Sequence, residues 1–254
     1  MTCPRTPRSP ATRLWCGRYS GHIEFLVLRS RALTASADNL QPTTPGRVDV
    51  RDTRTKVVVL ASGAGTLLKS LADAARAVDY PAQIVAVGLD RQCAAGEHAA
   101  ALSIPSFTVQ VKDFADRAAW DEALADAVTA HNPDLVVSAG FMKILGPAFL
   151  DRFGGRIINT HPALLPAFPG AHAVPDALAY GVKVTGSTVH LVDSGVDTGP
   201  ILAQESVPVL DGDTESTLHE RIKIVERRLL ADVIAAVATR GVVSDGRKAV
   251  IPSE

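Results

Sequence analysis

The fold is decided by the stretch Lys56-Val57-Val58-Val59-Leu60-Ala61-Ser62-Gly63-Ala64-Gly65-Thr66. Its β-branched run is typical of a strand buried on both faces of a parallel sheet, and an apolar-periodic helix is predicted over residues 67–78. Glycines between the two elements let the backbone approach a ligand. The free N–H groups at the start of a helix favour an anion such as phosphate. The stretch therefore predicts a strand, an anion-binding glycine turn and a helix.

The same alternation of strand and helix repeats downstream. Further buried strands are predicted at residues 83–89, 106–109 and 134–138, and helices at residues 94–102 and 114–130. Alternating units of this kind are typical of a doubly wound parallel sheet with right-handed crossovers. We therefore predict an α/β fold with a Rossmann-like, mostly parallel sheet.

The final third of the chain follows a different pattern. Two β-like runs, residues 184–192 and 201–209, are joined by a polar loop, which suggests an antiparallel pair added to the sheet. A long amphipathic helix is predicted over residues 214–239, with Asp213 as its N-cap and Gly241 as its stop. The sheet is therefore expected to be mixed, with antiparallel strands at one side.

Composition narrows the class of protein. The chain has 254 residues, 46% hydrophobic and 21% charged, which is ordinary for a globular protein. Its net charge of −1 gives no whole-molecule argument for nucleic acid or an acidic membrane as a partner. No apolar run approaches the roughly 20 residues needed to cross a bilayer. We therefore expect neither a nucleic-acid nor a membrane partner.

The start of the chain differs from the rest. Residues 1–55 are rich in Arg, Thr, Pro and Ser and lack a sustained period, which predicts a disordered or loosely attached N-terminal extension. The three cysteines, Cys3, Cys16 and Cys93, form no C-x-x-C pair and are interpreted as reduced thiols. These features favour a cytoplasmic location.

Chemistry-bearing residues first appear in the stretch Gly155-Arg156-Ile157-Ile158-Asn159-Thr160-His161-Pro162-Ala163-Leu164-Leu165-Pro166-Ala167-Phe168-Pro169-Gly170. A strand that ends near His161 would project Asn159 and His161 to one side and Thr160 to the other. Asn can hold a developing oxyanion and His can act as acid or base near neutral pH. An edge histidine beside a turn-forming Asn explains this stretch equally well. A second polar loop, with Asp193 and Asp197, supplies carboxylates that could orient the imidazole.

Together the motifs N-x-H-P-A-L-L-P-A-F-P-G and D-T-G-P resemble those of the folate-dependent formyltransferases, and the resemblance covers residues 56–243. It implies a formyltransferase domain over residues 56–254. It also implies an enzyme of one-carbon metabolism that moves the formyl group of 10-formyltetrahydrofolate, a co-substrate, to the amine of glycinamide ribonucleotide. The products would be formylglycinamide ribonucleotide and tetrahydrofolate, in de novo purine biosynthesis.

The resemblance also implies roles for individual residues. Catalysis is implied for Asn159, His161 and Asp197: the first two stabilise the oxyanion and Asp197 assists proton transfer through water. Ribonucleotide binding is implied for Gly65, Thr66, Leu67, Lys223, Ile224, Val225 and Glu226. Folate binding is implied for Arg117, Met142, Lys143, Ile144, Leu145, Asn159, Asp193, Ser194, Gly195, Val196 and Asp197. Leu67 stands where Asn is common in the family, and Lys143 where Arg is frequent. His172 is expected to help bind substrate and His190 to be structural.

Other functions stay open at this point. A formyltetrahydrofolate hydrolase would use the same Asn, His and Asp, although residues 1–55 lack the β-α-β pattern of its regulatory domain. A non-catalytic nucleotide-binding module would share the fold without the chemistry. Asp90 lies where an NAD-dependent oxidoreductase would place a ribose-binding acid, but the glycine turn lacks a third glycine, so a strand-end or capping role is favoured.

Two further expectations concern ligands and assembly. No metal is expected, because the sequence shows no cluster of His, Cys, Asp or Glu with ligand spacing. The sequence does not decide the oligomeric state, and a homodimer is left open.

Overall fold

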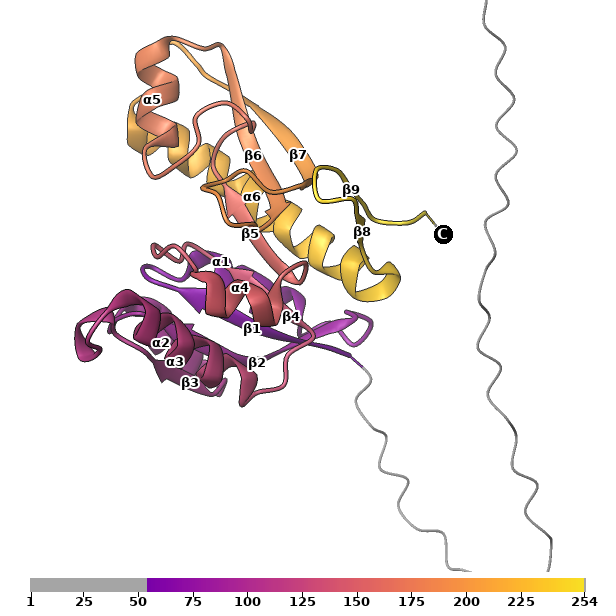
Figure 1. Ribbon diagram of the computed structural model, residues 1–254. Coiled ribbons are helices and arrows are strands. Elements are labelled where there is room, and N and C mark those ends of the chain that lie inside the picture. The colour runs from indigo at the N-terminus through magenta and orange to yellow at the C-terminus, as the bar shows by residue number, and fades with distance from the viewer. Residues whose placement is uncertain (1–53, 254) are drawn as a thin grey trace, which may run out of the picture. The chain divides into compact units, whose positions relative to one another are not determined.

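The computed structural model describes residues 54–253, so the predicted extension, apart from its last two residues, lies outside the described residues. Within this part of the chain seven strands form one mixed sheet in the order β3-β2-β1-β4-β5-β6-β7 (Figure 1). The strands are β1 (Thr55–Ala61), β2 (Ala82–Leu89), β3 (Ser106–Thr108), β4 (Leu135–Ser138), β5 (Ile157–His161), β6 (Val184–Leu191) and β7 (Ile201–Pro208).

Strand pairing confirms the predicted mixed sheet. The first five strands pair in parallel, whereas β6 is antiparallel to both β5 and β7. Strand order reverses between β1 and β4, because β2 and β3 extend the sheet on one side and β5 to β7 on the other. Ligands in open α/β sheets bind beside such a reversal, at the carboxyl ends of the strands.

Helices cover both faces of the sheet. They are α1 (Thr66–Ala74), α2 (Ala94–Ala101), α3 (Arg117–Thr129), α4 (Pro147–Phe153), α5 (Ala173–Tyr180) and α6 (Glu215–Arg240), with a short 3₁₀ turn η1 (Val111–Asp113). Residues of α1, α2 and α6 pack in one core cluster, and residues of α3 and α4 pack in another. Helix α6 contacts β5, β6 and β7, so it lies along the antiparallel side of the sheet (Figure 1).

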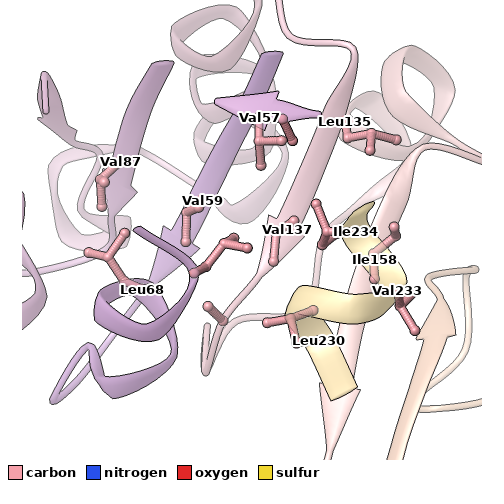
Figure 2. Close-up of a cluster of buried hydrophobic side chains, with 14 of the residues drawn as sticks. Val57, Val59, Leu68, Val87, Leu135, Val137, Ile158, Leu230, Val233 and Ile234 are labelled. Carbon is pink, nitrogen blue, oxygen red and sulfur yellow. The ribbon is translucent and has the colours of Figure 1, made fainter. Parts of the chain in front are cut away.

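The alternation of side chains along the strands explains both cores. Val57 and Val59 of β1 belong to the first cluster, with Leu68 of α1 and Ile234 of α6, whereas Val58 points into the second. Figure 2 shows Val57, Val59 and their neighbours on adjacent strands facing the helix residues. The side chains of residues 57–59, Leu68 and Ile234 are each at most 1% exposed, and burying each one contributes roughly 1.5–3 kcal/mol. The buried β-branched runs therefore make a rigid platform for the loops at the strand ends.

Several predicted boundaries are corrected by the structure. Helix α1 ends at Ala74, and Val78 is fully exposed because the chain turns through residues 75–79. Helix α3 begins at Arg117, where the Asp116 side chain accepts a hydrogen bond from the Ala119 N–H.

The predicted N-cap of α6 is wrong by one residue. Thr214 caps the helix in a capping box with Thr217, whereas Asp213 instead forms an ion pair with Arg221. The sequence pattern also missed α5. It predicts one short terminal strand within residues 242–254, where the structure has a small antiparallel pair, β8 (Val243–Ser244) and β9 (Ala249–Val250). Over the described residues, none of the helices combines the length and the apolar character that spanning a membrane requires.

Candidate functional site

A cavity of about 580 Å³ opens at the carboxyl ends of β1, β4 and β5, where the strand order reverses. Five segments form its wall: the glycine turn, the loop after β4, the end of β5, the loop after β6 and one face of α6. The lining residues are Gly63, Ala64, Gly65, Thr66, Leu67, Ser138, Ala139, Gly140, Phe141, Met142, Lys143, Ile144, Leu145, Asn159, Thr160, His161, Pro162, Gly170, Ala171, His190, Val192, Asp193, Gly195, Val196, Asp197, His219, Lys223 and Glu226.

The end of β5 places the three proposed catalytic groups together. Asn159 and His161 lie on one face of the strand, as the period of two predicts. Asn159 Nδ2 lies 3.5 Å from Asp197 Oδ1, and His161 Nδ1 lies 3.2 Å from Asp197 Oδ2. Asp197 comes from the loop after β6, so two segments far apart in the sequence meet here. The arrangement can hold a negative charge and move a proton at one point of the cavity wall.

Asp197 is held in an unusual backbone conformation. Its φ of 55° lies in the left-handed region, which a residue other than glycine adopts mainly where the surroundings enforce it. The Gly170 N–H donates to its Oδ2 at 2.7 Å. Burial would raise the pKa of Asp197, but the contacts with His190, the Gly170 N–H and His161 outweigh it and lower the pKa. Asp197 is therefore an anion at neutral pH.

His190 has more contacts with this group than its predicted structural role required. It lies opposite Asn159 across the β5–β6 pair, and its Nδ1 donates to the Leu191 carbonyl at 2.8 Å. Its Nε2 lies 3.1 Å from Asn159 Nδ2 and 3.6 Å from Asp197 Oδ1. That nitrogen can accept from the amide when unprotonated and face the carboxylate when protonated. His190 therefore contacts two of the three proposed catalytic residues.

The glycine turn opens the cavity on the side of α1. Gly65 is the N-cap of α1, with φ 68°, and a Cβ there would come within 2.7 Å of the Ala95 backbone, so only glycine fits. No side chain caps α1, and its first turn carries no acidic residue. The N-terminal N–H groups of α1 are therefore not taken by a capping side chain of the described residues, as an anion subsite needs.

Helix α6 contributes a polar face to the cavity wall. Lys223 and Glu226 line the cavity, and so does His219, one helical turn before Lys223. Glu226 is 6% exposed and accepts a hydrogen bond from Thr160 Oγ1 at 2.9 Å. Burial raises the pKa of Glu226, against the opposing effects of Thr160, Lys223 and Arg227. Thr160, which points away from Asn159 and His161, thus connects β5 to this wall.

The loop after β4 forms the third wall and is tied down at both ends. Met142 N donates to Ser62 Oγ at 2.8 Å, and Lys143 Nζ lies 2.9 Å from Asp90 Oδ2. At the other end Gly146 N donates to Asp121 Oδ1 at 2.6 Å. The side chains of Met142 and Ile144 are exposed at the cavity. The loop therefore offers backbone groups and apolar side chains from a fixed frame.

Five residues singled out from the sequence lie outside the cavity wall. They are Arg117, His172, Ser194, Ile224 and Val225. Arg117 Nη2 donates to the Ile144 carbonyl at 2.5 Å, so it braces the loop after β4. Ile224 is exposed on the outer side of α6, while Val225 packs beneath that helix. The sequence missed His219, although its spacing of four from Lys223 and seven from Glu226 places all three on one helix face.

Asp90 follows β2 directly, as predicted, but it does not cap a helix, because the N-cap of α2 is Cys93. Its buried carboxylate bonds Arg91 and Lys143. Among the described residues no group of three or more His, Cys, Asp and Glu side chains could hold a metal ion.

Comparison with known proteins identifies the family. The chain is 68% identical to the phosphoribosylglycinamide formyltransferase of Mycobacterium tuberculosis over 194 residues, which cover 76% of this chain and 90% of that protein. It is 39% identical over 180 residues to the enzyme of the same name from Bacillus subtilis, covering 70% and 92% of the two chains. The structure of glycinamide ribonucleotide transformylase 1 from Symbiobacterium toebii matches with a TM-score of 0.76 and 39% identity, over 78% of this chain and 93% of that one. A family model described as formyl transferase matches residues 55–234, and the chain belongs to the formyl transferase family.

Proposed function

We propose that this protein is a phosphoribosylglycinamide formyltransferase, which transfers the formyl group of 10-formyltetrahydrofolate to the primary amine of glycinamide ribonucleotide. The products are formylglycinamide ribonucleotide and tetrahydrofolate, and the step belongs to de novo purine biosynthesis. Its relatives carry the name of this activity. The observation that carries the proposal is the meeting of Asn159, His161 and Asp197 at a cavity that also holds the uncapped start of α1.

The ribonucleotide is assigned to the side of the cavity between α1 and α6. Backbone N–H groups at Gly65, Thr66 and Leu67 suit a phosphate, since the helix dipole favours an anion there. Lys223 adds a positive charge to the same cavity. Glu226 is the acidic group on this wall and suits the glycinamide amine. These assignments keep the phosphate and the amine on one wall, with the amine directed toward the end of β5.

The folate is assigned to the side formed by the loop after β4 and the loop after β6. The cavity volume of about 580 Å³ lies within the range of roughly 300–1,000 Å³ that ligand sites of this kind have. Backbone groups of residues 142–145 and 193–197 can pair with the edge of a pteridine, and Met142, Ile144 and Val196 supply apolar surface. Asn159 and Asp197 lie at the inner end of this side, next to the reacting groups.

The residues divide the chemistry as follows. Asn159 Nδ2 donates to the formyl oxygen as that oxygen gains negative charge, and the His161 imidazolium stabilises the same charge. The amine nitrogen forms its bond to the formyl carbon while the bond from that carbon to folate N10 breaks. Asp197, together with a water molecule, carries the proton that the amine loses toward N10. The electron pair of the broken bond stays on N10, which takes up the proton that the amine loses, so no covalent bond to the enzyme is needed.

Location and assembly are parts of the same proposal. An enzyme that uses these two soluble substrates is assigned to the cytoplasm, and a homodimer is a candidate assembly. Neither substrate requires a nucleic-acid partner, a membrane or a metal ion.

A turnover assay tests the proposal against the hydrolase. The full chain is mixed with 10-formyltetrahydrofolate, and release of tetrahydrofolate is followed with and without glycinamide ribonucleotide. Tetrahydrofolate is expected only with the amine present, in equal amount to formylglycinamide ribonucleotide. Equal release without the amine would assign the chain to hydrolysis instead, and no release in either mixture would favour a binding module.

A further inference from the structure

Asp90 has no assigned role, yet its carboxylate is enclosed and contacts a residue of the cavity wall, Lys143. Its side chain is 1% exposed, and it binds Arg91 through Nε at 3.1 Å and Nη2 at 2.8 Å. It also binds Lys143 Nζ at 2.9 Å. Burial would raise the pKa of Asp90, but the hydrogen bonds from Arg91, Lys143 and Ser62 outweigh it and lower the pKa. Asp90 is therefore a buried anion whose oxygens are occupied by groups of this chain.

Two of its three partners lead to the same loop. Lys143 belongs to the loop itself, and Ser62 Oγ accepts the Met142 N–H at 2.8 Å while the Ser62 hydroxyl bonds Asp90. Ser62 N also donates to the Gly140 carbonyl at 3.2 Å. Asp90 thus holds consecutive residues, Met142 through Ser62 and Lys143 directly. These contacts connect the ends of β1 and β2 to the loop after β4.

We propose that Asp90 is a positioning residue for the folate side of the cavity, and that the Lys143 ammonium tethers the loop to Asp90 instead of binding the folate. The inference rests on the proposed function for the identity of the ligand. The backbone of residues 142–145 then faces the cavity in one conformation, with Met142 and Ile144 presented to it. Breaking a buried ion pair from one side leaves an uncompensated charge, so each partner matters for the position of the other.

The geometry also argues against Lys143 as a folate-binding residue. Its side chain is only 26% exposed, and its nitrogen forms a close ion pair with a carboxylate that cannot move away, because Arg91 and Ser62 hold it. To reach a folate, the ammonium would have to leave the enclosed Asp90 carboxylate, whose side chain is 1% exposed. A lysine that donates to Asp90 keeps the loop close to the sheet instead.

The first test measures the loop directly, in the full chain without substrates. Amide hydrogen exchange of residues 142–145 is compared in the wild type, Asp90→Asn, Lys143→Met and Arg91→Met. Asp90→Asn and Lys143→Met are expected to speed exchange in this loop by about 10-fold or more, since local opening is controlled by such contacts. Arg91→Met is the matched control, because it removes a cation from the same carboxylate without touching the loop. Unchanged exchange in both loop variants would overturn the proposal, whether or not the protein transfers formyl groups.

The second test uses kinetics and the double variant. Asp90→Asn and Lys143→Met are each expected to raise KM for 10-formyltetrahydrofolate about 10-fold and to leave KM for glycinamide ribonucleotide within about twofold. The KM of the double variant for 10-formyltetrahydrofolate should be no higher than that of the more affected single variant. Lys143→Arg should restore the wild-type KM. A rise with Lys143→Met but not with Asp90→Asn would show that Lys143 binds the folate itself. If Asp90→Asn fails to fold, the hydrogen exchange of residues 142–145 in Lys143→Met decides, because it is measured without folate and Asp90 keeps Arg91 in that variant.

Discussion

His161 Nδ1 lies 3.2 Å from Asp197 Oδ2, while Nε2 of the same ring lies 2.8 Å from the Phe168 carbonyl oxygen. The Phe168 carbonyl can only accept a hydrogen bond, so Nε2 carries a hydrogen in this contact while Nδ1 faces the carboxylate. For His161 to donate to a formyl oxygen one contact has to open, and the uncharged Phe168 carbonyl is the weaker partner.

The contact between His161 and Asp197 predicts coupled losses of activity. His161→Ala and Asp197→Asn are each expected to lower kcat, the first by about 10²–10³, as for removal of an oxyanion-hole donor. Residues that act as a unit are not additive. The double variant should therefore lose much less than the product of the two single losses, measured as kcat with both substrates saturating.

The control for this cycle is Asp211→Asn. The Asp211 side chain is fully exposed, and its Oδ1 lies 3.9 Å from Lys183 Nζ. This variant should leave kcat unchanged. Strictly multiplicative losses in the double variant would mean that His161 and Asp197 act independently, and the proton route through Asp197 would have to be withdrawn.

The charge of Asp197 predicts a change in the pH profile. Its lowered pKa means that it is ionised over the whole working range, where it stabilises a positive ring at His161. Asn at this position removes that charge from beside the ring. The alkaline limb of the kcat profile should move down by about one pH unit or more. Steady-state rates measured from about pH 5 to about pH 9 give the shift. An unmoved limb would remove His161 from the proton-dependent step.

The N-terminal extension gives a prediction about truncation. Deleting residues 1–50 is expected to leave the melting temperature and turnover nearly unchanged, because β1, the first strand of the sheet along the chain, begins at Thr55. Thermal unfolding and the formyl-transfer assay on the shortened chain provide the measurement. A large loss in either quantity would mean that the extension contributes to the core or to the site.

Local sequence patterns predicted the platform of the site better than its details. The run from Lys56 to Ala61 predicts β1 because burial on both faces demands continuous apolar residues, and the period of two correctly separates Thr160 from Asn159 and His161. The contact of His190 with Asn159 could not be predicted, since it depends on the register between β5 and β6. Likewise the pair of Lys143 and Asp90 joins two loops whose closeness only the strand order creates. Helix α5 was missed because it is short and follows a proline-rich loop.

The last prediction concerns how the buried carboxyl group of Glu226 makes the stability of the protein depend on pH. Its pKa is raised by burial, so the folded state holds the proton more tightly than the unfolded chain. Below the unfolded pKa both states are protonated and the burial carries no electrostatic cost. As the pH rises through the folded pKa, ionisation inside the protein lowers the free energy of unfolding. Glu226→Gln should therefore have a higher melting temperature than the wild type at pH 8, and the difference should vanish toward pH 4, near the ordinary pKa of about 4.3 for a glutamate.

A matched control and a second variant separate this effect from packing. Glu220→Gln changes the same residue type on the same helix, where contact with Lys223 lowers the pKa, so it should not stabilise the protein at pH 8. Thr160→Val removes the hydroxyl that donates to Glu226 and should cost about 0.5–1.5 kcal/mol of stability, with Thr160→Ser restoring it. Glu226→Gln should also raise KM for glycinamide ribonucleotide, because a neutral amide binds an ammonium less well than a carboxylate. A variant that gains stability at neutral pH but keeps the wild-type KM would show that Glu226 is buried for the fold alone and does not bind the amine.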